Sequence, residues 1–247
     1  MTRALAAAAA ALLLAAAPAA AADTPVAVLL YHHVSAADDD PLYVTPRLFR
    51  RHLAALDRAG YEAITLRRAW RAWEEDGRLP AKPVVLSFDD GYADQFRNAA
   101  KALRARRWPG VLFLQSARLD VDGGLSTAQV RRLLRQGWEL GAHTVTHPDL
   151  RGLGNEGLAE EVGGSREALR RAFPSEPVDF FAYPFGRFDP VVVDAVRAAG
   201  FTGATTTRRG LAEPSDGAFT LDRQVITGGF TPKRLLRGIR GATSHRR

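Results

Sequence analysis

One kind of boundary recurs along this chain: an amphipathic stretch ends in glycine, and the next residue is aromatic and begins a short apolar run. It occurs at Gly60-Tyr61, Gly137-Trp138 and Gly200-Phe201. Glycine adopts the left-handed backbone conformation that ends a helix, and the aromatic side chain then enters the core. Repeated boundaries of this kind predict alternating helices and strands, which is the pattern of a parallel α/β fold.

Short apolar runs and amphipathic stretches alternate along the rest of the chain as well. Thr45 is placed to cap a helix that has Pro46 at its first position, where proline is well tolerated. The pattern predicts strands at 26–32, 61–66, 83–88, 110–115, 138–143, 179–184 and 201–206, and helices at 46–60, 66–77, 93–107, 127–137, 155–173 and 190–200. About seven such units favour a closed or nearly closed α/β barrel over an open sheet, in a single domain.

The first 22 residues have the pattern of a secretory signal peptide. Arg3 supplies the positive charge, an Ala/Leu run follows, and small residues precede Asp23. A membrane anchor is the alternative, but Pro18 interrupts the apolar run and no positively charged flank follows it. We therefore expect removal of residues 1–22 and an exported domain at 23–247, periplasmic or secreted, with no stable membrane anchor.

The chain contains no cysteine, which excludes disulfides, thiolate nucleophiles and cysteine-based zinc sites. Any bound metal must therefore use histidine or carboxylate ligands. The formal net charge is +7, and the C-terminal tail is strongly basic. Such a tail suits anionic cell-wall polymer, membrane or nucleic acid, but no basic–aromatic motif indicates nucleic-acid binding. We interpret the charge as solvated, and the sequence does not indicate an oligomeric state.

Polar residues stand where several predicted strands end. They are Tyr31-His32-His33, Asp89-Asp90, His143 with His147, and Tyr183-Pro184-Phe185. In parallel α/β folds the ligand site lies at the carboxyl ends of the strands. We therefore expect these groups to meet at one end of the barrel.

Asp89 and Asp90 follow a buried apolar run, where two adjacent carboxylates cost free energy unless something compensates them. His143 and His147 are four residues apart, so a helical turn at 143–147 would direct both imidazoles to one side. Two histidines and one carboxylate form a metal-binding set that leaves positions open for water and substrate. In this interpretation one aspartate binds the metal and the other acts as a general base.

The segments SFDDG, HTVTH and YPFG, in this order and at these separations, resemble the first three motifs of the polysaccharide deacetylases, carbohydrate esterase family 4 with its NodB-homology domain. The resemblance extends from VLLYHHV to about Thr227. It implies a distorted (β/α)7 barrel and metal-dependent removal of acetyl groups, usually from N-acetylglucosamine polymers. The implied cofactor is one divalent metal, most often zinc, with cobalt or nickel as alternatives.

The resemblance also implies roles for single residues. The general base would be Asp89, and the metal ligands would be Asp90, His143 and His147. The backbone N–H of Phe185, which follows Pro184, would hold the oxyanion. Phe185 and Tyr92 are candidates for lining a sugar groove, although Phe185 fits an ordinary core position equally well.

The chain departs from the family pattern in its second half. Ala182 stands where many members have arginine, the Asp-x-x-Asp-Trp motif is absent, and no Leu-x-x-His element follows. The late His245 lies in the tail and is not expected to be catalytic, so the catalytic acid is open. His32 is a candidate for it, with simple packing at the barrel rim as the alternative, and Arg223 is a candidate for tuning Asp89.

The early YHHV segment combined with an arginine-less FAYPFG resembles the subgroup that deacetylates poly-β-1,6-N-acetylglucosamine. Other functions fit part of the pattern. A catalytically degenerate barrel would bind glycan without hydrolysing it, and an O-acetyl esterase would use the same site geometry. Phosphoryl transfer through an aspartate nucleophile leaves HTVTH unexplained, and adjacent carboxylates do not flank a glycosidic bond as glycosidases require. We therefore favour N-deacetylation.

Overall fold

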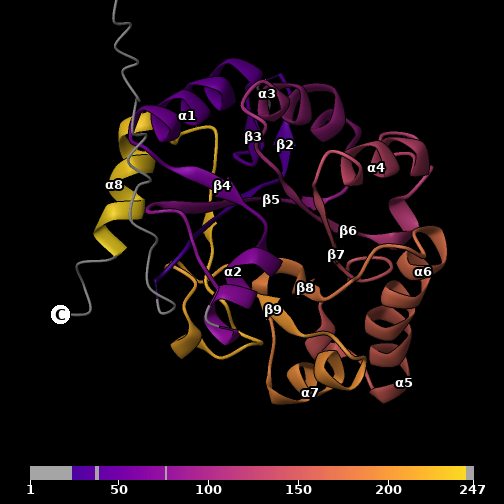
Figure 1. Ribbon diagram of the computed structural model, residues 1–247. Coiled ribbons are helices and arrows are strands. Elements are labelled where there is room, and N and C mark those ends of the chain that lie inside the picture. The colour runs from indigo at the N-terminus through magenta and orange to yellow at the C-terminus, as the bar shows by residue number, and fades with distance from the viewer. Residues whose placement is uncertain (1–23, 37–38, 76, 243–247) are drawn as a thin grey trace, which may run out of the picture.

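One curled parallel sheet organises the molecule. The computed structural model describes residues 24–36, 39–75 and 77–242 (Figure 1). The expected signal peptide at 1–22 and the tail residue His245 lie outside the described residues. The strands follow the order β10-β1-β5-β6-β7-β8-β9, and β4 pairs with the first half of β5. Their bounds are β1 Ala27–Tyr31, β4 Glu62–Ile64, β5 Pro83–Asp90, β6 Val111–Leu114, β7 Glu139–Ala142, β8 Phe180–Ala182, β9 Gly203–Thr205 and β10 Gln224–Val225.

The segment that leads into β10 joins the two edges of this sheet. Leu221 pairs with Thr205 at the end of β9, and three residues later Gln224 pairs with Leu29 of β1. The chain between these pairings therefore crosses from one edge strand to the other. The result is the distorted (β/α)7 barrel that the sequence predicts, in a single α/β domain.

Helices surround the sheet (Figure 1). They are α1 Pro46–Arg58, α2 Leu66–Glu74, α3 Lys101–Arg104, α4 Thr127–Leu134, α5 Asn155–Leu158, α6 Gly164–Ala172, α7 Pro190–Ala198 and α8 Pro232–Ala242. The π-helical stretches η1 Gln95–Ala100 and η4 Ala159–Gly163 continue into α3 and α6, and the short 3-10 turns are η2 Ser116–Arg118, η3 Leu150–Gly152, η5 Pro184–Gly186 and η6 Pro214–Asp216. A small separate sheet pairs β2 His33–Val34 with β3 Tyr43–Val44. Among the described residues, no helix is long and apolar enough to cross a membrane.

The predicted helices are present, and five of the six begin at the predicted residue, but each ends one to three residues before its predicted end. The Thr45 side chain accepts a hydrogen bond from the N–H of Leu48 at the start of α1. Gly60, Gly137 and Gly200 have φ angles of 78°, 86° and 83°, which is the left-handed conformation that ends a helix. The aromatic residues that follow these glycines pack in or against the main core.

Successive side chains of β5 point to opposite sides of the sheet. Val84, Leu86 and Phe88 pack in the cluster beneath the outer helices, whereas Val85 belongs to an inner cluster that α2 covers. By the same alternation Asp89 points into the barrel interior. Figure 1 shows α2 across the middle of the barrel.

Helix α2 covers the amino-terminal ends of the strands. The backbone N–H of Arg67, in its first turn, donates to the carboxylate of Glu139, which is the first residue of β7. The opposite end of the barrel, where the strands end, is left for the polar residues that the sequence places there.

Candidate functional site

Asp89 is buried, and its carboxylate has a fully buried counter-charge. Nη1 and Nη2 of Arg223 donate to Oδ1 and Oδ2 of Asp89, each at 2.8 Å, while Nε of Arg223 donates to the carbonyl oxygen of Thr206. Burial opposes ionisation of Asp89, but Arg223, helped by His143, outweighs it, so the pKa of Asp89 lies below its usual value. Asp89 is therefore an ionised carboxylate at neutral pH.

The carboxylate of Asp90 faces two imidazoles. Its Oδ1 lies 3.6 Å from Nε2 of His143 and 3.7 Å from Nε2 of His147, and the two Nε2 atoms are 3.1 Å apart. One ligand atom from each of these three residues lies within 4.8 Å of the others. Burial lowers the pKa of His143, which keeps its imidazole neutral and its nitrogen lone pair available.

The contacts around this triad suit a divalent metal. Nδ1 of His143 donates to the carbonyl oxygen of Ala182 at 2.7 Å, which leaves Nε2 free to bind an ion. Nε2 of Gln115 donates to Oδ1 of Asp90 at 2.6 Å and orients that carboxylate. Two imidazoles and one carboxylate with open positions are typical of zinc and similar ions. Gln115 is not among the site residues predicted from the sequence, although it directly follows β6 at a strand end.

The prediction of a helical turn at 143–147 is wrong. These residues form an irregular loop after β7, with φ angles of 64° at Thr144 and 69° at His147. The hydroxyl of Thr144 accepts from the N–H of His147 at 2.8 Å, and the carboxylate of Glu161 accepts from two N–H groups of the loop. Side-chain acceptors thus replace the helical hydrogen bonds and bring the two imidazoles together.

Backbone strain concentrates at this site. Six non-glycine residues in the described part of the chain have positive φ, and four of them belong here: Asp90, Thr144, His147 and Phe185. A left-handed conformation costs such a residue on the order of 1–2 kcal/mol and persists only where the surroundings impose it. At Asp90 the φ of 72° breaks the alternation of β5. The side chain therefore turns to the histidines while Asp89 faces the interior.

His32 follows β1 at the same end of the barrel. Its Nδ1 is buried and has no hydrogen-bond partner among the described residues. Burial lowers the pKa of His32, while the charges of Asp89 and Asp90 act in the opposite direction. His32 therefore lies within electrostatic reach of both carboxylates.

The ring of Tyr92 packs against His33 and Arg118. The His33 ring stacks on it with centroids 3.6 Å apart, and the guanidinium carbon of Arg118 lies 4.6 Å from its centroid. Burial, followed by the charge of Asp90, raises the pKa of Tyr92 to about 12. Tyr92 therefore borders the metal-ligand residue Asp90, with which its hydroxyl is hydrogen-bonded.

Phe185, in contrast to Tyr92, has an exposed ring. It follows the buried Pro184, its side chain is 56% exposed, and its ring centroid lies 4.6 Å from that of His147. The structure therefore places Phe185 on the surface beside the triad and not in the core.

The sequence of this region matches a known protein family. Residues 76–204, just over half of the chain, match the family described as polysaccharide deacetylase. The matched region runs from before β5 into β9 and contains both aspartates and both histidines of the site. The chain belongs to the polysaccharide deacetylase family.

Individual relatives are distant in sequence. The chain is 31% identical over 121 residues to the chitooligosaccharide deacetylase of Sinorhizobium fredii. The aligned region covers 49% of this chain and 54% of that protein, so this chain spans about half the length of that relative. BC0361, a polysaccharide deacetylase from Bacillus cereus, gives a TM-score of 0.77 at 28% identity over 87% of this chain and 69% of that one. The deacetylase PplD of Streptococcus pyogenes, solved in complex with acetate, gives a TM-score of 0.82 at 22% identity, over 88% of this chain and 99% of that one. At this identity the similarity concerns the fold alone.

Proposed function

We propose that the protein is a metal-dependent hydrolase that removes N-acetyl groups from a polysaccharide containing N-acetylglucosamine. The observation that carries this proposal is the contrast between two adjacent carboxylates: Asp89 is ion-paired with Arg223, while Asp90 faces two imidazoles. A barrel that only binds glycan has no use for a buried, ionised base beside three metal ligands. Similarity to a chitooligosaccharide deacetylase supports the same class of substrate.

Asp90, His143 and His147 would hold one divalent metal of the kind that prefers imidazole nitrogen: zinc first, then cobalt or nickel. A metal bound there supplies Lewis-acid chemistry, which lowers the pKa of a coordinated water from ~16 to about 7. Gln115 and the carbonyl of Ala182 already orient two of the ligands.

Asp89 would accept the proton of the attacking water. Arg223 uses two of the roughly four lone-pair sites of its carboxylate and leaves the others free. Oδ2 of Asp89 lies 3.8 Å from Nε2 of His143, so the base stands beside the metal ligands. In this arrangement Arg223 lowers the pKa of the base, which keeps the carboxylate ionised, and fixes its orientation.

His32 would supply the proton for the departing amine. Its buried Nδ1 lacks a partner among the described residues. Burial lowers the pKa of His32 and the charges of both aspartates oppose that shift, so the imidazole lies close to the two carboxylates. The variant His32→Gln tests this role. A large fall in turnover with folding intact supports it, and unchanged turnover removes His32 from the mechanism.

The exposed ring of Phe185 would stack on a sugar, and its backbone N–H would hold the oxyanion. Pro184 fixes the start of that turn, and Tyr92 would also contact the sugar. Ala182 in place of arginine, together with His32, favours a β-1,6-linked N-acetylglucosamine polymer over a β-1,4-linked one. We further propose that residues 1–22 direct export of a domain at 23–247, to the periplasm or the medium.

The test is acetate release by the purified protein from N-acetylglucosamine oligomers with β-1,4 or β-1,6 linkages. The protein is first treated with a chelator and then given zinc, cobalt or nickel. The proposal predicts release that depends on the metal and is greater for the β-1,6 oligomer. Release from O-acetylated xylan alone would make the protein an O-acetyl esterase. Metal binding without release from any glycan would make it a binding module.

A further inference from the structure

The charged residues differ between two sets of helices in this protein. On each of α2, α6 and α7, one exposed arginine pairs with a carboxylate; the pairs are Arg68–Glu62, Arg171–Glu167 and Arg197–Asp194. The helices α1, η1–α3, α4 and α8 together contain one carboxylate, Asp57, and it pairs with Arg106. All other charged side chains on these four helical segments are arginine or lysine.

A groove of about 630 Å³ lies between η1–α3 and α4, two of these cationic segments. Phe96, Ala100 and Leu133 form its apolar part, and its charged lining residues are Arg97, Lys101, Arg104 and Arg132. The guanidinium of Arg132 lies 5.8 Å from the centroid of the Phe96 ring. Within the described chain, none of these four cations forms an ion pair with a carboxylate.

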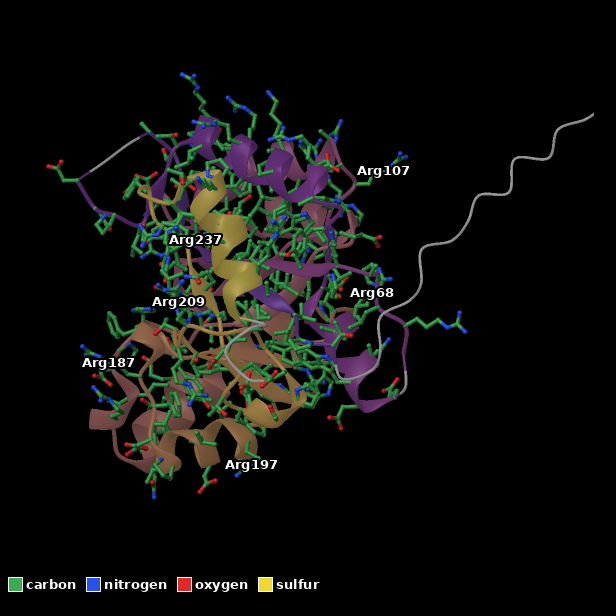
Figure 2. All side chains as sticks on the ribbon, turned by 90° about the vertical axis from the view of Figure 1, so that its left-hand side faces the viewer. Arg68, Arg107, Arg187, Arg197, Arg209 and Arg237 are labelled. Carbon is green, nitrogen blue, oxygen red and sulfur yellow. The ribbon has the colours of Figure 1, made fainter. Side chains whose placement is uncertain are left out.

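The cationic surface continues beyond the groove. Helix α1 packs against η1 and against α8, and it exposes Arg50, Arg51 and Arg58. Figure 1 shows α8, α1, α3 and α4 following one another around the barrel, with α6 next after α4 and α7 on the far side from α1. Figure 2 looks onto α8, which carries Arg237, with α1 beside it.

Neighbouring cations without counter-charges repel one another, and a bound anion relieves this repulsion. Four cations from two helical segments line this groove, and one small anion carries too little charge to neutralise all of them. A linear polymer with one phosphate per repeat brings several charges into the groove, and its binding releases condensed counterions. The groove therefore suits a chain-like polyanion.

A bilayer fits this surface less well. In the described chain the large apolar side chains that are exposed are Val121, Phe185 and Val191. None of them belongs to α1, η1–α3, α4 or α8. Helices that lie in a membrane interface bury large apolar side chains there, and these segments have none to bury.

We infer that the groove between η1–α3 and α4 is a second binding site, for a linear polyanion with a phosphate backbone. The site belongs to the outer helices, whereas the metal triad lies at the strand ends. A protein held by this groove keeps its triad free for substrate, so the site tethers the enzyme to anionic polymer.

The test measures binding of the protein to long-chain inorganic polyphosphate at several salt concentrations. A groove variant with Arg97→Gln, Lys101→Gln, Arg104→Gln and Arg132→Gln is compared with a control variant of equal charge. The control carries Arg68→Gln, Arg71→Gln, Arg170→Gln and Arg171→Gln on α2 and α6. Circular dichroism establishes that both variants are folded, and acetate release from soluble oligomers establishes that the metal site is intact.

The inference predicts that the groove variant binds polyphosphate about tenfold or more weakly and that its salt slope falls by about three to four, with the control within about twofold of wild type. Acetate release stays unchanged in both variants. Equal weakening in the two variants would overturn the inference, because net charge alone would then explain binding. Competition by inorganic monophosphate at equal phosphate concentration would also overturn it, as would tight binding to phosphatidylglycerol vesicles without binding to polyphosphate.

Discussion

Each end of the barrel buries a carboxylate, and the two carboxylates have different partners. At the carboxyl ends of the strands, Asp89 forms two hydrogen bonds with Arg223, whose side chain is 0% exposed. At the amino ends, Glu139 is buried to a similar degree, but Arg67 is 21% exposed and lies 4.0 Å from it. Arg67 is also bonded to Asp179, and Oε1 of Glu139 has no hydrogen-bond partner in the described chain.

The difference shows that the counter-charge, and not burial alone, sets the charge of a buried carboxylate. The pKa of Asp89 lies below its usual value because Arg223 outweighs burial. Burial raises the pKa of Glu139 to about 7, and the partly exposed Arg67 only partly opposes it. One end of the barrel therefore holds a permanent carboxylate, and the other holds a group that titrates near neutral pH.

Removal of Arg223 should have the largest effect on stability. Arg223→Met leaves Asp89 ionisable, buried and without its partner, so we expect a loss of about 3–5 kcal/mol in the free energy of unfolding. Urea denaturation of the metal-free protein measures this loss. A loss below about 1 kcal/mol would mean that Arg223 does not stabilise the Asp89 carboxylate.

Glu139→Gln should change how stability depends on pH. Because the pKa of Glu139 is raised in the folded protein, its contribution to the free energy of unfolding is fully present below about pH 4.5 and is lost as pH rises through about 7. Between pH 5 and pH 8 the free energy of unfolding of the wild type should therefore fall by up to about 3 kcal/mol relative to that of the variant. Denaturation curves of both proteins at the two pH values give this difference, and a difference that does not change with pH would contradict the account.

Arg67→Met should have the smallest effect, a loss of about 1 kcal/mol in the free energy of unfolding. Glu139 can take up a proton when its partner is removed, because its pKa already lies near 7. The loss should therefore be greater at pH 8 than at pH 6. A loss as large as that of Arg223→Met would remove the distinction between the two ends of the barrel.

Much of the fold was predictable because local signals coincide with it. The helix-ending glycines, the cap at Thr45 and the apolar runs are properties of neighbouring residues, and the structure confirms the elements that they predict. The closing pairing of Leu221 with Thr205 was not predictable, since it depends on how the sheet curls.

The site was predictable in its residues but not in its geometry. The strand-end rule brought Asp90 and the two histidines together, and the structure places them within 4.8 Å. The loop at 143–147 was misjudged because its shape depends on Glu161, a residue of a distant helical segment. Arg223 could be only a candidate partner of Asp89 at the level of sequence, since no local pattern links residues 134 positions apart.

The most direct test of the central claim compares metal content and acetate release in Asp89→Asn and Asp90→Asn. We predict that Asp89→Asn keeps one bound metal per chain and loses about 10²–10⁴-fold in acetate release. Asp90→Asn should lose both the metal and the activity, because it lacks one of the three ligands. Loss of the metal in Asp89→Asn, or wild-type acetate release by it, would contradict the assignment of different roles to the two adjacent carboxylates.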